Sequence, residues 1–92
     1  MGEFVVVRTY AAGVHVGELV SVTEKQVMLR DARRLWRWRG ANTLHEVALR
    51  GVAEEWTRIS EPVARVLLLD SVEAIEATPE AAANLRRSRW GK

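Results

Sequence analysis

The pattern of apolar and polar residues over the first part of the chain is typical of strands in a sheet. Glu3–Thr9 is rich in β-branched residues, and the three valines that follow Phe4 predict a strand that is buried on both faces and therefore central. Val14–Val22 alternates between apolar and polar residues, and Gly17 within it predicts a bulge or a close backbone approach. With Gln26–Arg30 as a third strand after a polar turn, these segments predict an antiparallel meander.

The segment Ala32–Arg39 alternates arginines with large apolar side chains, and Gly40 ends it. A strand would place Arg34, Trp36 and Trp38 on one face, whereas a helix would separate the two indoles widely around its axis. We therefore expect a fourth strand here.

Two segments carry the signals of a helix start. The apolar residues of 44–50 have helical spacing, and either Asn42 or Thr43 can cap this short helix. Thr78–Glu80 begins a second helix with a capping hydroxyl, a proline at the first helical position and an acid near the positive helix end. We expect this C-terminal helix to continue to about Arg89.

Between the helices, three segments predict further strands. Glu54–Ser60 alternates weakly, Val63–Leu69 has the apolar run of a strand with a buried centre, and Val72–Ala77 alternates imperfectly. A chain of 92 residues supports one core, so residues 1–92 are expected to form a single domain. The fold class that these elements predict is α+β: a strongly bent antiparallel sheet with one short helix after the fourth strand and a C-terminal helix.

The composition excludes several classes of protein. Apolar residues make up 48% and charged residues 28% of the chain, a globular balance that argues against disorder. The absence of cysteine excludes a disulfide framework, a thiolate metal site and a cysteine nucleophile. No apolar run is long enough to span a membrane and no signal-peptide pattern opens the chain, so we expect a soluble protein inside a cell, without a membrane partner.

Positive charge is concentrated in two places, although the net charge is only +2. The first lies within 30–39, where five arginines accompany a single acid, Asp31. The second is C-terminal and contains Arg86, Arg87, Arg89 and Lys92. Twelve of the 14 cations are arginine, whose planar guanidinium binds phosphate in two places and stacks on aromatic rings. A GC-rich genome would explain the high proportion of arginine but not its clustering.

The chain offers little for catalysis. His15 and His45 are its only histidines, and Leu49 stands where a zinc-protease helix beginning at His45 would need its second histidine. No glycine-rich segment matches a phosphate loop or a dinucleotide-binding fingerprint. Paired carboxylates are present, but such pairs are typical of solvated surfaces. We therefore expect a protein that is not an enzyme and that has no metal and no cofactor.

The segment Arg33–Arg39 interleaves arginines and tryptophans, the combination that a nucleobase with a phosphate requires. A base stacks on an indole for about 1–3 kcal/mol, and a guanidinium binds the phosphate oxygens. The alternative is structural: one indole face packs in the core or in a subunit contact, and the arginines keep an exposed strand soluble. Trp56 and Trp90 are expected to be core or interface anchors.

A second candidate site lies at the end of the first strand. Arg8, Thr9 and Tyr10 bring together a cation, a hydroxyl and a phenol before a flexible turn whose N–H groups could face an anion, and His15 follows the turn. The structural alternative is that Tyr10 packs on the sheet and Gly13 provides a turn conformation. The sequence leaves both possibilities open.

Several segments resemble a family of small tailed-phage proteins, labelled as a domain of unknown function, that has a member in the T-even phages. The resemblance covers nearly the whole chain, and its first block is the most specific. It is carried by Phe4–Leu19 (FVVVRTYAAGVHVGEL), Ala32–Trp38 (ARRLWRW), Gly40, Ala41, Leu44, Gly51, Glu73–Glu76 (EAIE) and Thr78.

This family is associated with phage sponge proteins, small homo-oligomers that sequester the cyclic nucleotide signals of bacterial immune systems such as CBASS. The resemblance implies immune evasion in the cytoplasm of a host bacterium, by binding a cyclic nucleotide or dinucleotide without cleaving it. The ligand-binding residues would then be Arg33 and Arg34 for the phosphates, Trp36 or Trp38 and Tyr10 for the base, Thr9 and His15 for its orientation, and Arg8 beside them. Arg37 departs from the aromatic or acidic residue of many relatives, which leaves the identity of the ligand open.

Two other functions are consistent with the sequence. The same surface of arginines and tryptophans would suit a nucleic-acid-binding module, whose affinity would fall steeply with salt. A virion or assembly component would use Arg86–Trp90 as a docking tail. In each case, a 92-residue chain with four tryptophans and a valine-rich sheet has more apolar surface than one small core hides, so we expect a homo-oligomer built from dimers.

Overall fold

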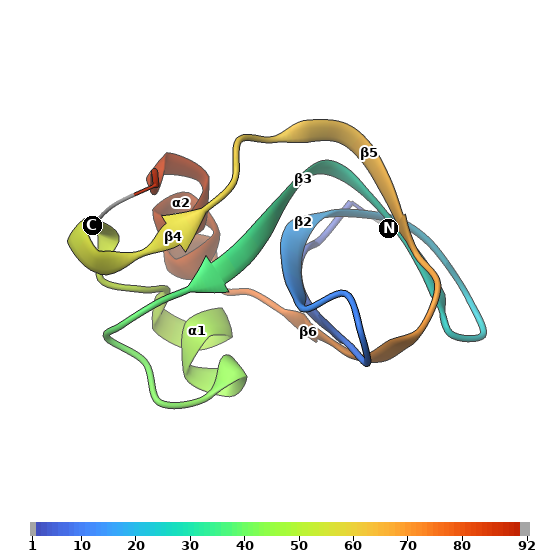
Figure 1. Ribbon diagram of the computed structural model, residues 1–92, viewed down its shortest axis with the longest axis horizontal. Coiled ribbons are helices and arrows are strands. Elements are labelled where there is room, and N and C mark those ends of the chain that lie inside the picture. Colours follow the sequence, from blue (N-terminus) through green and yellow to red (C-terminus); the bar gives the residue numbers. More distant parts are fainter. Residues whose placement is uncertain (1, 91–92) are drawn as a thin grey trace.

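The computed structural model describes residues 2–90, which form a bent sheet with helices against one side (Figure 1). In chain order the elements are β1 (Phe4–Thr9), β2 (Val14–Thr23), β3 (Gln26–Arg37), α1 (Leu44–Arg50), the 3-10 helix η1 (Glu54–Trp56), β4 (Arg58–Ile59), β5 (Val63–Leu68), β6 (Ser71–Glu76) and α2 (Pro79–Arg87). The predicted α+β class, bent antiparallel sheet, short helix and C-terminal helix are confirmed. Within residues 2–90, no helix is long and apolar enough to cross a membrane.

The sheet is curled, and its strand order explains why. The strands lie in the order β4-β3-β2-β1-β6, with β5 also paired to β3, and every pairing is antiparallel. β5 and β6 are therefore at opposite edges, yet only Leu69 and Asp70 separate them in the chain. In a flat sheet these edges would be roughly 19 Å apart, whereas the short connection spans at most about 11 Å. The strands accordingly curve so that the two edges approach each other (Figure 1).

One long strand, β3, replaces the third and fourth strands that the sequence predicts. A bulge at Asp31, whose φ is 50°, explains the difference, because it adds a residue to β3 between the partners of Val16 and Glu18. Gly17 lies opposite this bulge, and a Cβ on it would stand 3.0 Å from the carbonyl oxygen of Arg30. The close approach predicted at Gly17 is therefore confirmed.

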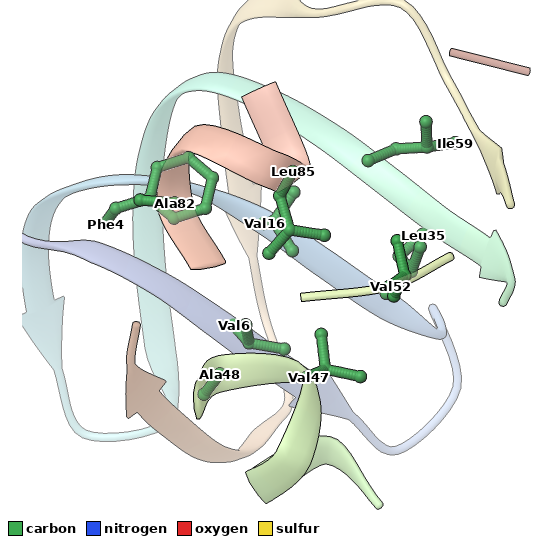
Figure 2. Packing of buried hydrophobic residues seen from close by; sticks show 10 residues of the cluster. All are labelled: Phe4, Val6, Val16, Leu35, Val47, Ala48, Val52, Ile59, Ala82 and Leu85. Carbon is green, nitrogen blue, oxygen red and sulfur yellow. The ribbon is translucent and has the colours of Figure 1, made fainter. Parts of the chain in front are cut away.

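The sheet separates two apolar clusters. The first lies on the face that α1 and α2 cover, and its buried members are Phe4, Val6, Val16, Leu35, Val47, Ala48, Val52, Ile59, Ala82 and Leu85 (Figure 2). The second lies inside the curl and consists of Val5, Val7, Val27, Leu29, Ala32 and Leu68. β1 contributes to both clusters, with Val6 on one side and Val5 and Val7 on the other, and the exposed fractions of these valines are 0%, 4% and 0%. The prediction of a central strand buried on both faces is confirmed.

The later strands differ from the sequence prediction in length and burial. The predicted strand 54–60 consists of η1 and a two-residue strand, β4. For β5 the sequence predicts a buried centre, but only Leu68 is buried, and Val63, Leu67 and Leu69 are 52%, 45% and 66% exposed. The prediction of burial is wrong here because β5 is an edge strand that pairs with β3 alone among the described strands.

Both helices begin at the threonines that the sequence offers as caps. The side-chain oxygen of Thr43 accepts a hydrogen bond from the N–H of Glu46 at 3.2 Å. That of Thr78 accepts from the N–H of Ala81 at 3.1 Å. The predicted starts are confirmed, and α2 ends at Arg87, slightly before its predicted end.

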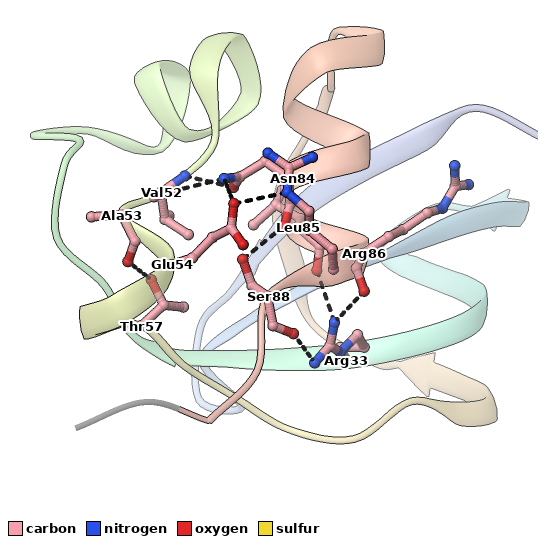
Figure 3. A network of polar contacts seen from close by, with 10 residues as sticks. Arg33, Val52, Ala53, Glu54, Thr57, Asn84, Leu85, Arg86 and Ser88 are labelled. Carbon is pink, nitrogen blue, oxygen red and sulfur yellow. Dashed lines mark hydrogen bonds and ion pairs between the residues drawn. The ribbon is translucent and has the colours of Figure 1, made fainter.

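The buried side chain of Asn84 joins α2 to the segment that follows α1. Its Oδ1 accepts from the Val52 N–H at 2.8 Å, and its Nδ2 donates to the Val52 carbonyl oxygen at 2.9 Å (Figure 3). Gly51 has a φ of 81°, and a Cβ on it would overlap the Asn84 amide. The end of α1 and the middle of α2 are thereby held together through one amide side chain.

Candidate functional site

A groove of about 350 Å³ lies between the turn that joins β1 to β2 and the strand β5. One side is formed by Thr9, Ala11, Ala12, His15 and Arg34, and the other by residues 66–70. Three residues that the sequence marks as ligand-binding candidates, Thr9, His15 and Arg34, therefore line the same groove.

The pairing of three strands brings His15 and Arg34 to this groove. Val7 pairs with His15, and His15 pairs with Arg34. Residues that pair directly in an antiparallel sheet direct their side chains to the same face, and Val7 belongs to the cluster inside the curl. The paired residues Val7, His15 and Arg34 therefore form a row that faces the inside of the curl. Along this row the side chains change from apolar to polar as it reaches the groove.

The Arg34 guanidinium lies against Gly13. A Cβ on Gly13 would stand 3.1 Å from Nη2 and 3.2 Å from Nε of Arg34. Gly13 also has a φ of 83°, in the left-handed region that favours glycine. The main-chain N–H of Arg34 bonds to Ser60, but within residues 2–90 its guanidinium has no hydrogen-bond or ion-pair partner. The charge is therefore available to an anion in the groove.

The His15 imidazole is half-buried beside this guanidinium. Its Nε2 lies 3.0 Å from the carbonyl oxygen of Ala12, which can only accept, so Nε2 carries the ring proton in the neutral form. Burial lowers the pKa of His15 and the charge of Arg34 lowers it further, while the hydrogen bond to Ala12 opposes the shift. The ring is therefore neutral at neutral pH, and its Nδ1 is a hydrogen-bond acceptor.

Thr9 holds the turn in place. The residue is 8% exposed, and its hydroxyl donates to the Gly13 carbonyl oxygen at 2.7 Å and accepts from the Ala12 N–H at 2.9 Å. Its main-chain N–H bonds to the same Gly13 oxygen at 3.0 Å. These bonds use the hydroxyl proton and one lone pair to shape the turn, and the role of Thr9 in orienting a ligand stays a prediction.

Arg8 and Tyr10 lie outside the groove. Arg8 is on the face of β1 opposite to Thr9, and its Nε is 3.0 Å from Oε1 of Glu73 on the neighbouring strand, so the structure does not bring it together with the other candidates in the groove. Tyr10 is 82% exposed, so it does not pack on the sheet. Its main-chain N–H donates at 3.0 Å to the carbonyl oxygen of Asp70, a groove residue, which places Tyr10 at the rim.

Arg33 is a structural residue, which corrects its assignment to a phosphate. It is 8% exposed, and its Nε donates to the carbonyl oxygen of Ser60 at 2.7 Å. Nη1 donates to the carbonyl oxygens of Leu85 and Arg86 at 2.8 and 2.9 Å, and Nη2 donates to that of Ser88 at 2.6 Å (Figure 3). The guanidinium therefore binds the last carbonyl groups of α2, which have no partners within the helix.

Trp36 and Trp38 do not share a face. Trp38 follows the end of β3, is half-buried against the first cluster, and donates from Nε1 to the carbonyl oxygen of Ala41 at 3.2 Å. Trp36 is 54% exposed and stacks on Trp90. The predicted common face is wrong because the strand ends at Arg37, and Trp38 packs in the core as the structural alternative expects.

Trp36, Trp90 and Arg58 form a second feature, which we call the aromatic cluster. The ring centroids of Trp36 and Trp90 are 5.6 Å apart, and their planes meet at 13°. The Arg58 Cζ lies 5.8 Å from the Trp36 centroid and 5.3 Å from the Trp90 centroid. Trp90 is 56% exposed, so it is not the core anchor that the sequence offers as one possibility. In a separate contact, Arg39 stacks on Trp56, with its Cζ 5.1 Å from the ring centroid.

Two parts of the groove and the aromatic cluster lie in segments that contain no recognisable sequence motif. Residues 66–70 form the apolar wall of the groove, and Arg58 is a lone cation in a weakly patterned segment. Pairing with β3 brings both into place. The one sequence signal for the wall is the run Leu67–Leu69, which places apolar side chains on both faces of a strand.

The groove combines an anion-binding group with an apolar wall. Its polar side chains include one guanidinium, one imidazole and the carboxylate of Asp70. Within residues 2–90, no three His, Asp or Glu side chains come together in a group that could hold a metal ion. The chemistry of the lining residues therefore suits an anion attached to a flat, mostly apolar group.

One family model matches most of the chain. Residues 2–85 correspond to the family described as Domain of unknown function (DUF6948). No curated protein and no solved structure matches the chain. A function has therefore to be inferred from the groove and the aromatic cluster.

Proposed function

The chain belongs to the DUF6948 family, and from its groove we propose that the protein binds a small phosphorylated nucleotide and withholds it without cleaving it. In the specific form of this proposal, the ligand is a cyclic nucleotide or cyclic dinucleotide immune signal. The protein is then a phage sponge that acts against CBASS-type immunity in the cytoplasm of a host bacterium. The resemblance to small tailed-phage proteins supports this form, and the free guanidinium in the groove is the observation that carries the binding function.

Arg34 supports phosphate binding. Its guanidinium lies against the glycine turn, and no carboxylate within residues 2–90 is paired with it. A guanidinium binds two phosphate oxygens at once, and such charge-assisted hydrogen bonds are stronger than neutral ones. His15 stands next to it as a neutral ring, so it adds a hydrogen-bonding group without a competing charge.

The opposite wall supports binding of the base. Val66 and Leu68 line the groove from the inner face of β5, and Leu67 and Leu69 line it while remaining 45% and 66% exposed. A planar base buries its ring against such an aliphatic wall, and Tyr10 at the rim offers an aromatic surface.

The contacts inside the groove favour retention of the ligand over cleavage. A nucleophile needs a base within hydrogen-bond distance to activate it. The Thr9 hydroxyl instead donates to the Gly13 carbonyl oxygen at 2.7 Å, and the His15 ring bonds to the Ala12 carbonyl oxygen at 3.0 Å. Neither group is directed at the other, which supports a binding protein.

The size of the groove supports a site that is shared between copies of the chain. A volume of about 350 Å³ is at the lower end of the range of ligand sites. It suits one nucleotide unit, so a cyclic dinucleotide would extend past the rim onto a second copy. The exposed side chains of Leu69, Tyr10 and Val72 around Asp70 support a homo-oligomer at this end, since clustered apolar side chains mark interfaces.

Ligand release tests this function. The protein is incubated with a panel of cyclic dinucleotides and cyclic ADP-ribose isomers, separated from free ligand, and heated. We expect one of these compounds to be released intact and in stoichiometric amount. The same compound should raise the melting temperature, because a ligand at a hundredfold excess over its Kd stabilises the fold by about 2.7 kcal/mol. Product beyond one equivalent would show an enzyme with His15 as general acid or base, and no shift with any compound would contradict nucleotide binding.

Arg34→Ala and Arg8→Ala form a matched pair for this assay. Both remove an exposed arginine near the β1–β2 turn, but only Arg34 lines the groove, since Arg8 is ion-paired with Glu73. We expect Arg34→Ala to weaken binding at least about tenfold, the size of a charge-assisted hydrogen bond, and Arg8→Ala to leave it unchanged. Equal losses in both variants would exclude the groove as the site.

A further inference from the structure

The aromatic cluster lies apart from the groove, and none of its three residues lines that groove. We propose that Trp36, Trp90 and Arg58 form a platform that binds single-stranded nucleic acid by base stacking. This site differs from the nucleotide site in residues and in ligand, so each can be tested without the other.

The exposure of the rings supports a role in binding. Trp36 and Trp90 remain 54% and 56% exposed although they stack on each other. In such a pair each ring covers only one face of its neighbour. Trp90 also belongs to neither apolar cluster of the described residues, so it is not needed to fill the core. Indole surface at the exterior is what a stacked base requires.

Arg33 holds the parts of the platform together. Trp90 follows α2, and Arg58 belongs to β4, so both come from segments distant from β3 in the chain. The Arg33 Nη2 donates at 2.6 Å to the carbonyl oxygen of Ser88, two residues before Trp90 (Figure 3). Its Nε donates at 2.7 Å to the carbonyl oxygen of Ser60, just after β4. A platform fixed in this way loses little conformational freedom when a ligand binds.

Positive charge borders the platform. Arg37 pairs with Arg58 across β3 and β4, and Arg89 lines a hollow of about 380 Å³ together with Trp90. Within residues 2–90, neither Arg37 nor Arg89 has an ion-pair partner, and Glu61 is the single carboxylate that lines this hollow. Arginines beside exposed indoles provide the phosphate contacts that accompany base stacking.

The charge in a second hollow lined by Trp90 is partly neutralised. Glu54 and Glu55 lie there with Arg87 and Arg89, and Glu54 is ion-paired with Arg87 at 2.8 Å. The platform and its surroundings still have more cations, Arg37, Arg58, Arg87 and Arg89, than acids, which are Glu54, Glu55 and Glu61, and this balance favours a polyanion. Two exposed rings with flanking arginines match a short run of bases and phosphates better than a protein surface, which needs a larger apolar area.

Fluorescence anisotropy with labelled oligonucleotides tests the platform. The probes are oligothymidine and oligouridine of about twelve nucleotides, within the range of sites for such platforms. We expect the wild-type protein to bind at about 50 mM salt and to lose affinity at about 200 mM. Trp36→Ala and Trp90→Ala should each weaken binding about five- to a hundredfold. The matched control Trp56→Ala removes a tryptophan that is 44% exposed but outside the cluster, and it should change affinity less than about twofold.

A melting curve shows whether each tryptophan variant folds. If one does not, variants that change the charge beside the platform provide a second test. Arg37→Glu and Arg89→Glu change exposed residues beside the platform, and each should weaken binding and reduce the salt slope by about one. Arg34→Ala, in the groove, should bind oligonucleotides like the wild type. Absence of wild-type binding at low salt, or undiminished binding by folded platform variants, would overturn the proposal, as would a loss confined to Arg34→Ala.

Discussion

The Nη2 of Arg33 donates to the carbonyl oxygen of Ser88 at 2.6 Å, across 55 positions of the chain (Figure 3). The next residue, Arg34, has its guanidinium against Gly13 in the groove, without a hydrogen-bond or ion-pair partner within residues 2–90. Successive residues of a strand face opposite sides. Two neighbouring arginines therefore have different tasks: one stabilises the end of α2, and the other offers its charge to a ligand.

Arg33→Ala should destabilise the protein by about 2–4 kcal/mol, because it removes a buried guanidinium and leaves several carbonyl groups without donors. Urea unfolding monitored by circular dichroism measures this loss. Arg34→Ala is the control, since a surface change away from packed groups costs about 0.5 kcal/mol or less. Similar unfolding midpoints for the two variants would contradict the structural role of Arg33.

Gly13→Ala should weaken ligand binding as well as stability. Alanine at a φ of 83° is strained by about 1–2 kcal/mol, and its Cβ would press on the Arg34 guanidinium, which would lie 3.1 Å away. Gly2→Ala separates the two effects, because Gly2 has a φ of 96° but nothing within 4 Å of a Cβ. We expect both variants to be strained but only Gly13→Ala to lose nucleotide affinity, measured by calorimetry. An equal affinity in both variants would show that the position of Arg34 does not matter.

Stability should fall with decreasing pH because of His15. Burial, and then the charge of Arg34, lowers the pKa of His15 below its usual 6.5, so the unfolded chain takes up a proton more readily than the folded one. This contribution is complete above the unfolded value and is lost as the pH falls through the lower folded value. As the pH falls through this range, the urea midpoint of the wild type should decrease relative to that of His15→Gln, which has no titratable group at this position. Parallel curves would show that His15 does not titrate in this way.

Leu67→Lys should separate the subunits of the proposed homo-oligomer. Leu67 is 45% exposed on the edge strand β5, and charge on an edge strand opposes association. Light scattering should show an oligomer for the wild type and a mass near 10.4 kDa for the variant. Glu76→Lys, which changes an exposed residue at the other edge, is the control. A wild-type monomer at micromolar concentration would contradict the homo-oligomer.

The sequence by itself determined the features that depend on residues close together in the chain. β-branching and a run of three valines identified β1 as a central strand, and Thr43 and Thr78 identified the helix starts. Gly17 marked the close approach of two strands. These are local properties. The alternation of side chains along a strand, the capping of a helix by a nearby hydroxyl and the absence of a Cβ on glycine each depend on residues within one strand or one turn.

Only the tertiary structure decided which residues form the sites. Whether Arg33 or Arg34 is free depends on the position of the end of α2, and the partner of Trp36 is a residue at the far end of the chain. An apolar run such as that of β5 would be buried if the strand were central in the sheet. β5 is an edge strand, so most of the run is exposed, and the sequence of the run does not distinguish the two positions. Side-chain burial and hydrogen-bond partners depend on contacts between distant segments, which strand order and the curl of the sheet establish.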